Sequence, residues 1–478
     1  MNYIIQNRKP ESFFRFFEEI SAIPRMSYHE EAIADYLVDF AKTRGLDYYR
    51  DTWNNVLIKK PASKGYEEKA PILFQGHTDM VCEKESGSDH DFLKDPLDLW
   101  IDGHFLRARG TTLGADDGMA VATMLALLDG EIEDHPAYEC LFTAAEEAGI
   151  VGAPKFDFSK ISARTLINID AGDPKYPLCS CSGALRTRIT MPFATEPIQG
   201  HAIHVHIGGL MGGHAGADIH RGRANANKVM GRLISALSSE GDVRIVSVNS
   251  GSKDSGIMRE CDAILSVSNV ENATAILKKH ADAISSELVD EDKNFFVSVE
   301  SATAETMMDQ TASDRTCGML ACLPTGVFSM CRDLPYLVEF SRNFGTVITE
   351  EQNVIFTFST RSASNSKLDS AAHELEAFAA MIGAQIEHFG RYPGWEYTPT
   401  SHVRDAYLSA YREITANEAI AVGVHAGIEC GVICAAIPDM DTVAIAPNAQ
   451  FLHSPAERLD LDSCETFWRV LRRMIEIL

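Results

Sequence analysis

Two adjacent carboxylates, Glu146 and Glu147, end an apolar run that begins at Leu141, and Gly149 follows closely. An apolar stretch that stops at two acidic residues and a glycine is typical of a buried strand that ends at a site. Neighbouring carboxylates suit a division of labour in which one binds a metal ion and the other moves a proton. The ordinary alternative is an acidic pair at the start of a helix, so the interpretation depends on what ends the other strands.

A second chemically useful pair is formed by His77 and Asp79. A strand is predicted over residues 71–75, and it leads through Gly76 into His77, Thr78 and Asp79. Side chains two positions apart on a strand lie on the same face. His77 can therefore bind a metal ion while Asp79 fixes the imidazole tautomer or supports the site from behind. Taken alone, such a pair is more often a partly buried histidine with satisfied hydrogen bonds.

A glycine-rich loop over residues 109–118 carries two aspartates, Asp116 and Asp117, into a helix of small residues predicted over 119–128. Aspartate at the start of a helix is an ordinary N-cap. A loop of glycines also allows a carboxylate to reach between two cations. The spacing does not decide whether Asp116 or Asp117 would take that position.

Two more predicted strands lead to side chains that can bind a metal. The strand over 164–170 ends in Asp170, and the strand over 442–446 is followed by a loop that contains His453. Ligands of open α/β sheets gather at the carboxyl ends of the strands, so these side chains are expected to meet at one edge. Two imidazoles and three carboxylates, one of them bridging, predict two ions about 3.5–4 Å apart. This set favours Zn, Mn or Co over Ca or Mg. The predicted ligands are His77, Asp116, Glu147, Asp170 and His453.

The order of the predicted elements indicates an α/β protein. Helices over 11–23 and 30–43 precede a strand over 55–59, and strands then alternate with helices. This alternation predicts a doubly wound, mixed-sheet catalytic domain. The alternation of strands and helices in the middle of the chain predicts a smaller inserted α+β domain. The expected segments are 1–184 and 391–478 for the catalytic domain and 185–390 for the insert.

Length and composition limit the possible functions. A chain of 478 residues exceeds one ordinary core, which favours two domains. The formal charge of −25 argues against nucleic acid or an anionic membrane as a partner. Residues 1–15 lack the apolar core of a secretory signal, and no apolar run is long enough to span a bilayer. Eleven thinly spread cysteines suit reduced thiols in the cytoplasm. The close pairs are expected to be small core residues: Cys179 with Cys181, and Cys430 with Cys434.

Residues 76–84 resemble the first metal motif of the dinuclear zinc peptidase family that includes glutamate carboxypeptidases, aminoacylases and bacterial dipeptidases. Together with residues 114–118, this motif is similar to that of the aminoacyl-histidine (Xaa-His) dipeptidase branch, and the resemblance extends from Ile23 to Glu457. It implies two zinc ions, with Asp116 as the bridge. It also implies one ion site completed by His77 with Asp170 and another by Glu147 with His453, Glu146 as general base, and Asp79 behind the histidine.

The resemblance also implies residues that bind the substrate. In the glycine-dense stretch 208–220, His214 matches a histidine that polarises the substrate carbonyl, often across a dimer interface. Arg361 matches an arginine that pairs with a substrate carboxylate, a task that suits its bidentate geometry. A separate hypothesis, from the stretch 425–431, places Glu429 near the free amine of the substrate. The alternatives are a solvent-facing histidine in a glycine turn and a routine surface arginine.

Several residues depart from the family pattern. Ser255 replaces a usual asparagine and Met258 a common proline in the lid stretch 250–260, while Ala145 replaces an aspartate before the glutamate pair. The run after Asp170 is also less acidic than usual. The metal ligands are unaffected by these changes. They bear on substrate preference, because the lid asparagine helps to hold the carboxylate end of the substrate.

The function predicted from these observations is metal-dependent hydrolysis of dipeptides with a free amine and a free carboxylate, of the Xaa-His type. The metals would lower the pKa of a bridging water to about 7, and Glu146 would accept its proton. An aminoacylase or related deacylase that uses the same ions is the alternative. A binding protein with an inactive site belongs to a third class, against which the complete ligand set argues. The expected partners are a small dipeptide and a second copy of the chain, joined through the inserted lid domain. Neither nucleic acid nor membrane is expected, and the location is cytoplasmic.

Overall fold

The first two helices of the chain are amphipathic, as their apolar spacing predicts. The computed structural model describes residues 3–251 and 253–478, so Ser252 of the lid stretch and residues 1 and 2 lie outside it. Helix α1 (Glu11–Ser21) buries its phenylalanines. Helix α2 (Glu31–Arg44) ends at Gly45, whose φ of 66° makes it the predicted glycine cap.

The chain divides into two compact units. The first unit comprises Met1–Cys181 and Gly394–Leu478, and the second comprises Ser182–Pro393. The sequence placed the corresponding boundaries at 184/185 and 390/391. The roles of these segments as a catalytic domain and a lid stay predictions.

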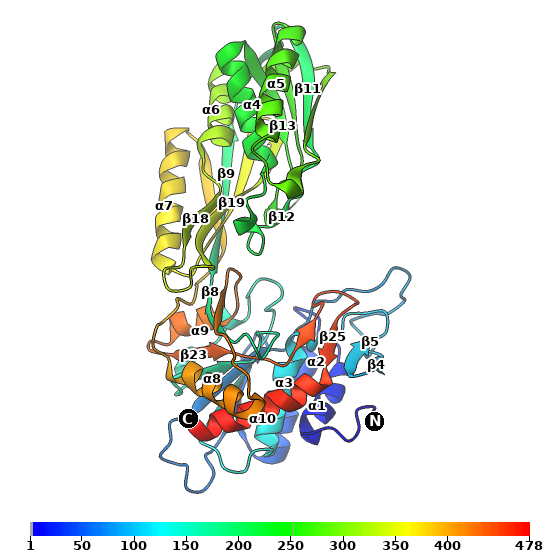
Figure 1. Cartoon of the computed structure of the whole chain (residues 1–478), viewed down its shortest axis with the longest axis vertical. Helices are drawn as coiled ribbons and strands as arrows, with labels where there is room; N and C mark the ends of the chain where they lie inside the picture. The colour runs from blue at the N-terminus through cyan, green and yellow to red at the C-terminus, as the bar shows by residue number, and fades with distance from the viewer. Residues whose placement is uncertain (1–2, 252) are drawn as a thin grey trace. The chain divides into compact units, whose positions relative to one another are not determined.

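The first unit is organised around an eight-stranded mixed sheet (Figure 1), which confirms the expected α/β fold. Strand β3 pairs in parallel with β6 and β7, and β23 pairs in parallel with β7. The carboxyl ends of these four strands therefore meet at one edge. In sheet order the strands are β1 (Asp47–Arg50), β2 (Val56–Lys60), β6 (Tyr138–Thr143), β3 (Ile72–His77), β7 (Thr165–Asn168), β23 (Asp441–Ala444), β8 (Leu178–Cys181) and β22 (Val422–Val424).

Both faces of this sheet are covered, which is why its central strands are apolar at nearly every position. Alternate residues such as Ile72 and Phe74 belong to a core shared with helices α1, α3 (Ala115–Asp129), α8 (His402–Thr415) and α10 (Leu461–Ile477). Leu73, between them, faces a second core that includes residues of helix α9 (Cys430–Ala436). Cys179, Cys181 and Cys430 are buried thiols, as predicted, and Cys434 is partly buried.

A small four-stranded sheet positions the loop that carries His453. Its strands are β4 (Leu99–Asp102), β5 (Phe105–Ala108), β24 (Ala449–Gln450) and β25 (Arg458–Asp460). Leu459 pairs with Leu106 and Ala449 with Leu459, so the segment between β24 and β25 is a hairpin anchored to β5.

The second unit contains two larger antiparallel sheets. The sheet β13-β15-β11-β16 packs against helices α4 and α5, which lie side by side (Figure 1), and the sheet β18-β19-β20-β9-β21 packs against α7. The helices of the second unit are α4 (Ala226–Glu240), α5 (Val270–Ser285), α6 (Gln310–Cys322) and α7 (Asn365–Met381). Its strands are β9 (Gly183–Pro192), β10 (Thr195–Pro197), β11 (His201–Gly208), β12 (Gly213–His214), β13 (Val243–Asn249), β14 (Gly256–Ile257), β15 (Cys261–Val267), β16 (Phe296–Ser301), β17 (Thr306–Met308), β18 (Gly326–Met330), β19 (Val338–Glu350), β20 (Asn353–Ser362) and β21 (Gln385–Tyr392). Short 3-10 turns lie at Ala153–Lys155, Phe158–Lys160, Ile219–Arg221 and Asp290–Asp292.

The ends of some elements differ from the predictions. Strand β7 stops at Asn168, two residues before Asp170, and helix α3 begins at Ala115 instead of Met119. In both places the site residues lie on irregular backbone at the strand or helix end. Hydrophobic spacing cannot locate such a boundary, because it reports burial and not backbone pairing. Among the described residues, no helix combines the length and apolarity needed to cross a membrane.

Candidate metal centre

Asp116 lies between the two histidines of the predicted ligand set. Its Oδ1 is 3.0 Å from Nε2 of His77, and its Oδ2 is 3.1 Å from Nε2 of His453. His77 is the last residue of β3, whereas His453 lies in the β24–β25 hairpin with a φ of 60°. One carboxylate thus directs an oxygen at each imidazole, an arrangement that suits a residue shared by two ions.

The five predicted ligands form two overlapping groups. Donor atoms of His77, Asp116 and Asp170 lie within 4.8 Å of one another, and those of Asp116, Glu147 and His453 do the same. Oε1 of Glu147 is 3.0 Å from Nε2 of His453. Asp116 is common to both groups.

Asp117 occupies a different position from its neighbour. Its buried Oδ2 accepts the backbone N–H of His77 at 3.2 Å. A Cβ on Gly76 would lie 2.2 Å from Cβ of Ala120 and 2.4 Å from Oδ2 of Asp117. The glycine before His77 therefore makes room for helix α3 and for Asp117, which supports the strand end instead of facing His453.

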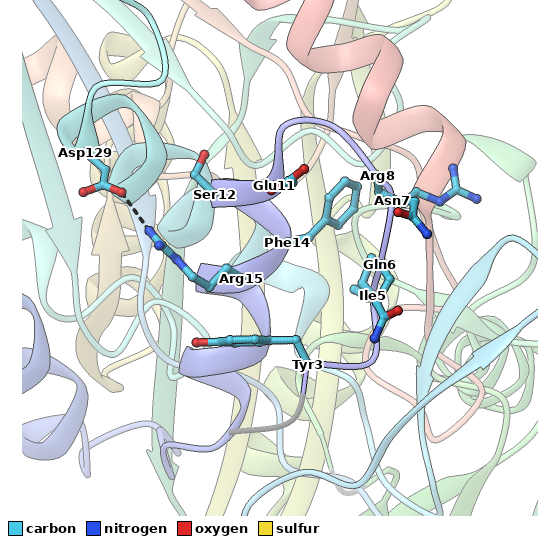
Figure 2. A pocket seen from close by; sticks show the side chains of 10 residues that line it. All are labelled: Tyr3, Ile5, Gln6, Asn7, Arg8, Glu11, Ser12, Phe14, Arg15 and Asp129. Atoms are coloured by element: carbon cyan, nitrogen blue, oxygen red, sulfur yellow. Dashed lines mark hydrogen bonds and ion pairs between the residues drawn. The ribbon is translucent and has the colours of Figure 1, made fainter.

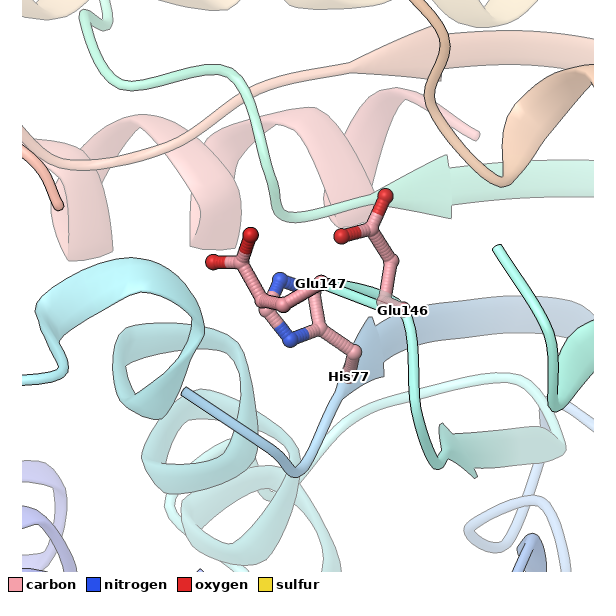
Figure 3. Close-up of side chains that lie close together, drawn as sticks. All are labelled: His77, Glu146 and Glu147. Carbon is pink, nitrogen blue, oxygen red and sulfur yellow. The ribbon is translucent and has the colours of Figure 1, made fainter. Parts of the chain in front are cut away.

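Glu146 and Glu147 follow β6 through Ala145, which has a φ of 51°. Donor atoms of both glutamates lie within 4.8 Å of His77, and Figure 3 shows both side chains beside the imidazole. Glu147 belongs to the group with His453, whereas Glu146 belongs to neither of the groups that contain Asp116. Glu146 is thus close to the potential ligands without being one of the five.

Asp79 lies behind this cluster and is fully buried. The imidazole Nδ1 of His77 is 3.1 Å from the backbone carbonyl of Asp79 and 3.4 Å from its Oδ1. The side chain also accepts the backbone N–H groups of Glu146 and Glu147 and the hydroxyl of Ser27. An Nδ1–H directed at Asp79 leaves Nε2 of His77 free to bind a cation.

The two imidazoles are held among negative charges. Hydrogen bonds to Asp116 and Glu147 raise the pKa of His453 to about 10. Burial acts to lower the pKa of His77, but hydrogen bonds to Asp116 and Asp79 outweigh it and hold the pKa well above its usual value. Burial acts to raise the pKa of Asp116, but its bonds to His453 and His77 hold it well below its usual range.

The remaining carboxylates raise one another's pKa values. Burial, with the charge of Asp116 adding to it, raises the pKa of Asp170 well above its usual value. Burial also raises the pKa of Glu146, and the charges of Asp170, Glu429 and Glu147 act in the same direction. Divalent cations would offset this excess of buried carboxylates over imidazoles. The donor set of imidazole and carboxylate therefore fits a pair of ions such as Zn, Mn or Co.

Glu429 lies beneath the strand ends, with only 1% of its surface exposed. Its Oε2 accepts hydrogen bonds from Nε2 of Gln75 and from the Thr143 hydroxyl, while Oε1 has no hydrogen-bond partner among the described residues. Burial raises its pKa to about 7. The expected contact with a substrate amine stays a prediction.

His214 and Arg361 belong to the second unit. Nδ1 of His214 accepts the backbone N–H groups of Gly216 and Ala217 at 3.2 and 3.1 Å, which leaves the proton of a neutral ring on Nε2. The side chain of His214 is exposed, which agrees with the solvent-facing alternative. Partial desolvation lowers its pKa, and the nearby charge of Arg361 lowers it further. Arg361 is mostly buried and donates to the hydroxyl of Tyr392 at 3.2 Å. Their expected roles in substrate binding stay predictions.

Three charged residues without a role predicted from the sequence contact the loops that carry the candidate ligands. Oε1 of Glu30 accepts the backbone N–H of Ala145 at 2.9 Å, Arg25 donates to three carbonyls, and Glu457 accepts from the start of α3. The signal in the sequence was their position next to motif residues: Glu457 is four residues from His453. Their partners are distant along the chain, so spacing could not reveal them.

A cavity of about 480 Å³ near the N-terminus is unrelated to this centre. Figure 2 shows its lining, which includes the ion pair of Arg15 with Asp129, 2.7 Å apart. Asp129 is the last residue of α3, about 20 Å along the helix from Asp116 at 1.5 Å per residue. None of the predicted site residues lines it.

Comparisons with known proteins show similarity to a family of peptidases. Residues 73–477 match the description "Peptidase family M20/M25/M40". The chain is 33% identical over 476 residues to the cytosol non-specific dipeptidase of Escherichia coli K12, which covers 98% of this chain and 97% of the relative. It is similar to the crystal structure of aminoacylhistidine dipeptidase from Vibrio alginolyticus, with 33% identity, a TM-score of 0.92, and coverage of 98% and 97%.

More distant structures share the fold. The aminopeptidase PepT from Bacillus cereus aligns with a TM-score of 0.58 at 15% identity, over 98% of this chain and 99% of that one. The family match spans all five candidate ligands, from the strand that ends at His77 to the hairpin that carries His453. The chain belongs to peptidase family M20/M25/M40, as its motifs indicate.

Proposed function

We propose that this peptide-bond hydrolase cleaves dipeptides that carry a free amine and a free carboxylate, and that it uses two divalent metal ions. The observation that carries the proposal is the position of Asp116, which directs one oxygen at His77 and the other at His453. Glu146 lies near His77. The names of the two relatives at 33% identity, both dipeptidases, support the substrate class.

In this proposal Asp116 would be shared by the two ions, His77 and Asp170 would hold one of them, and Glu147 and His453 would hold the other. When bound, the ions would lower the pKa of a shared water and polarise the scissile carbonyl. Zinc is the expected metal, with Mn or Co as alternatives for the same donors.

Glu146 acts as the general base. It accepts a proton from the attacking water and delivers it to the amine that leaves. Burial and the charge of Asp170 raise its pKa, so its carboxylate holds a proton more tightly than an exposed glutamate does, which suits a group that takes up and then delivers a proton. Asp79 keeps Nε2 of His77 directed at the site and holds the backbone of Glu146.

His214 and Arg361 bind the substrate. A neutral His214 with its proton on Nε2 can donate a hydrogen bond to the scissile carbonyl, and Arg361 pairs with the terminal carboxylate. Glu429 is assigned to the free amine. We further propose a preference for histidine in the second position, a homodimer formed through the second unit, and a cytoplasmic location, the last in line with the relative named a cytosol dipeptidase.

The direct test is hydrolysis of a panel of Xaa-His dipeptides, other dipeptides and N-acetyl amino acids, with and without a chelator. The proposal expects dipeptide cleavage that a chelator abolishes and that added Zn²⁺ restores. Turnover restricted to N-acetyl amino acids would replace it with a deacylase. Size-exclusion chromatography with light scattering would give the number of subunits in the oligomer.

A further inference from the structure

The carboxylate of Glu457 is surrounded by backbone donors at the start of helix α3. Oε2 accepts the N–H groups of Leu113 and Gly114 at 2.8 and 2.9 Å. Oε1 accepts that of Ala115 at 2.8 Å and lies 3.4 Å from that of Asp116. The helix has no side-chain cap of its own, and Glu457 is 2% exposed. A remote carboxylate thus satisfies the donors that a helix start leaves unpaired.

This contact joins two loops that carry predicted ligands. Glu457 lies on the same hairpin as His453, four residues later, and the N–H groups that it accepts lead directly into Asp116. The hairpin itself is fixed through the pairing of Leu459 with Leu106. A shift of Glu457 would therefore change the distance between His453 and Asp116.

Arg25 holds the same loop from another side. Its Nη2 donates to the carbonyl of Gly114 at 2.5 Å, and its Nη1 donates to the carbonyls of Thr78 and Asp79 at 3.1 and 3.2 Å. A Cβ on Gly114 would lie 2.4 Å from Nη2, and one on Gly118 2.9 Å from it. Both glycines of the motif 114–118 thus leave room for a buried guanidinium, a need that their flexibility alone does not explain.

We propose that Glu457 and Arg25 are positioning residues of the metal centre: together they fix the Asp116 loop against the strand end that carries His77 and against the hairpin that carries His453. Neither is among the candidate ligands. The proposal rests on the assignment of Asp116, His77 and His453 as ligands.

The substitution Glu457→Gln removes hydrogen-bond acceptance by one terminal group while it keeps the size of the side chain. Glutamine has the same shape, but one of its two terminal groups is an N–H donor that would face backbone N–H groups. The amide nitrogen cannot accept the two backbone N–H groups of residues 113–116 that it would face. We therefore expect the loop to move away from the hairpin. Arg25→Lys similarly removes the planar fork that reaches three carbonyls.

The test is titration of the metal-free protein with Co²⁺, followed by visible absorption, together with kcat and KM. We expect two equivalents to bind the unaltered protein. In Glu457→Gln and Arg25→Lys, the dissociation constant of the more weakly bound Co²⁺ should rise by about 10-fold or more. Their kcat at fixed metal should fall while KM stays within about twofold, and excess metal should restore part of kcat.

Glu139→Gln is the matched control. Glu139 is 3% exposed, accepts the backbone N–H groups of Ser162 and Ala163, and lies at the opposite end of β6 from the metal centre. Its replacement should lower the thermal midpoint of the metal-free protein without altering Co²⁺ binding.

Three outcomes are distinguishable. Binding of fewer than two Co²⁺ by the unaltered protein would contradict the proposed function itself. Two Co²⁺ bound with unchanged affinity by folded Glu457→Gln and Arg25→Lys would overturn only the positioning proposal. Affinity lost equally in Glu139→Gln would also overturn it, because the effect would then follow stability and not position.

Discussion

Asp79 accepts the backbone N–H of Glu146 at 3.0 Å through its Oδ1. Its Oδ2 accepts the N–H of Glu147 at 3.1 Å, and its Oδ1 is 3.4 Å from Nδ1 of His77. One buried carboxylate therefore sets the position of a candidate ligand on β3 and of two glutamates after β6. Both glutamates for which separate roles as ligand and base are proposed are thus held by the same carboxylate.

Glu146→Gln should keep both metal ions and lose nearly all turnover. The amide cannot accept the proton of the attacking water, and loss of a general base costs about 10²–10⁴-fold in kcat. Measured metal content together with kcat on an Xaa-His dipeptide checks this expectation. Glu139→Gln, at a buried glutamate near the start of β6, serves as the control. Substantial activity in Glu146→Gln would remove it from the role of base.

Asp79→Asn should weaken both metal binding and turnover. An amide N–H₂ would face one of the backbone N–H groups of Glu146 and Glu147, and the support of the His77 ring would be reduced. Outer partners of metal ligands typically contribute 10–100-fold in affinity or activity. Ser27→Ala removes only the hydroxyl bond to Oδ2 and should have a smaller effect. Equal effects of the two substitutions would show that Asp79 matters only through its hydrogen bond with Ser27, and unchanged metal binding in Asp79→Asn would contradict the prediction.

Metal binding should release protons at pH 8. Without a cation the pKa of His453 is raised to about 10 by Asp116 and Glu147, so a metal ion must displace its proton. The same shift stabilises the folded metal-free protein: this contribution is complete below about pH 6.5 and is lost as the pH rises through about 10. Calorimetric titration in two buffers of different ionisation enthalpy measures the release. A His453→Ala variant that releases as many protons as the original would contradict the assignment.

Gly76→Ala should destabilise the first unit and disturb the centre. The added Cβ would lie 2.2 Å from Cβ of Ala120 and 2.4 Å from Asp117, so strand and helix must separate. Such overpacking costs about 1–3 kcal/mol, measurable by urea unfolding. Gly318→Ala is the control, because helix α6 leaves open space at that position and alanine favours the helix. No loss of stability in Gly76→Ala would show that the helix can move away from β3.

Arg361→Lys should raise KM for dipeptides with a free carboxylate by about 10-fold or more. Lysine keeps the charge but loses the fork that pairs with both carboxylate oxygens. The C-terminal amides of the same dipeptides provide the comparison, since they lack the group that Arg361 would bind. A similar rise in KM for the acids and the amides would show that Arg361 does not bind the substrate carboxylate.

Much of the centre could be predicted from the order of residues. The apolar runs before His77, Glu146 and Asp170 predicted buried strands of an open α/β sheet, and in such sheets ligands gather at the carboxyl ends of the strands. Local chemistry therefore determined which side chains would meet, and the helix cap at Gly45 was equally readable. Helical spacing predicted α1, α2 and most of α3, whereas α8, α9 and α10, which also pack on the sheet, were not predicted.

The tertiary structure decided what depends on contacts between distant segments. It placed Asp116 between two imidazoles and Asp117 against the backbone of His77, although the two residues are adjacent and chemically identical. The direction of a side chain in a glycine-rich loop follows from its neighbours in space and not from its spacing. For the same reason, Glu457 and Arg25 gain their roles only when the folded chain brings 113–116 between them.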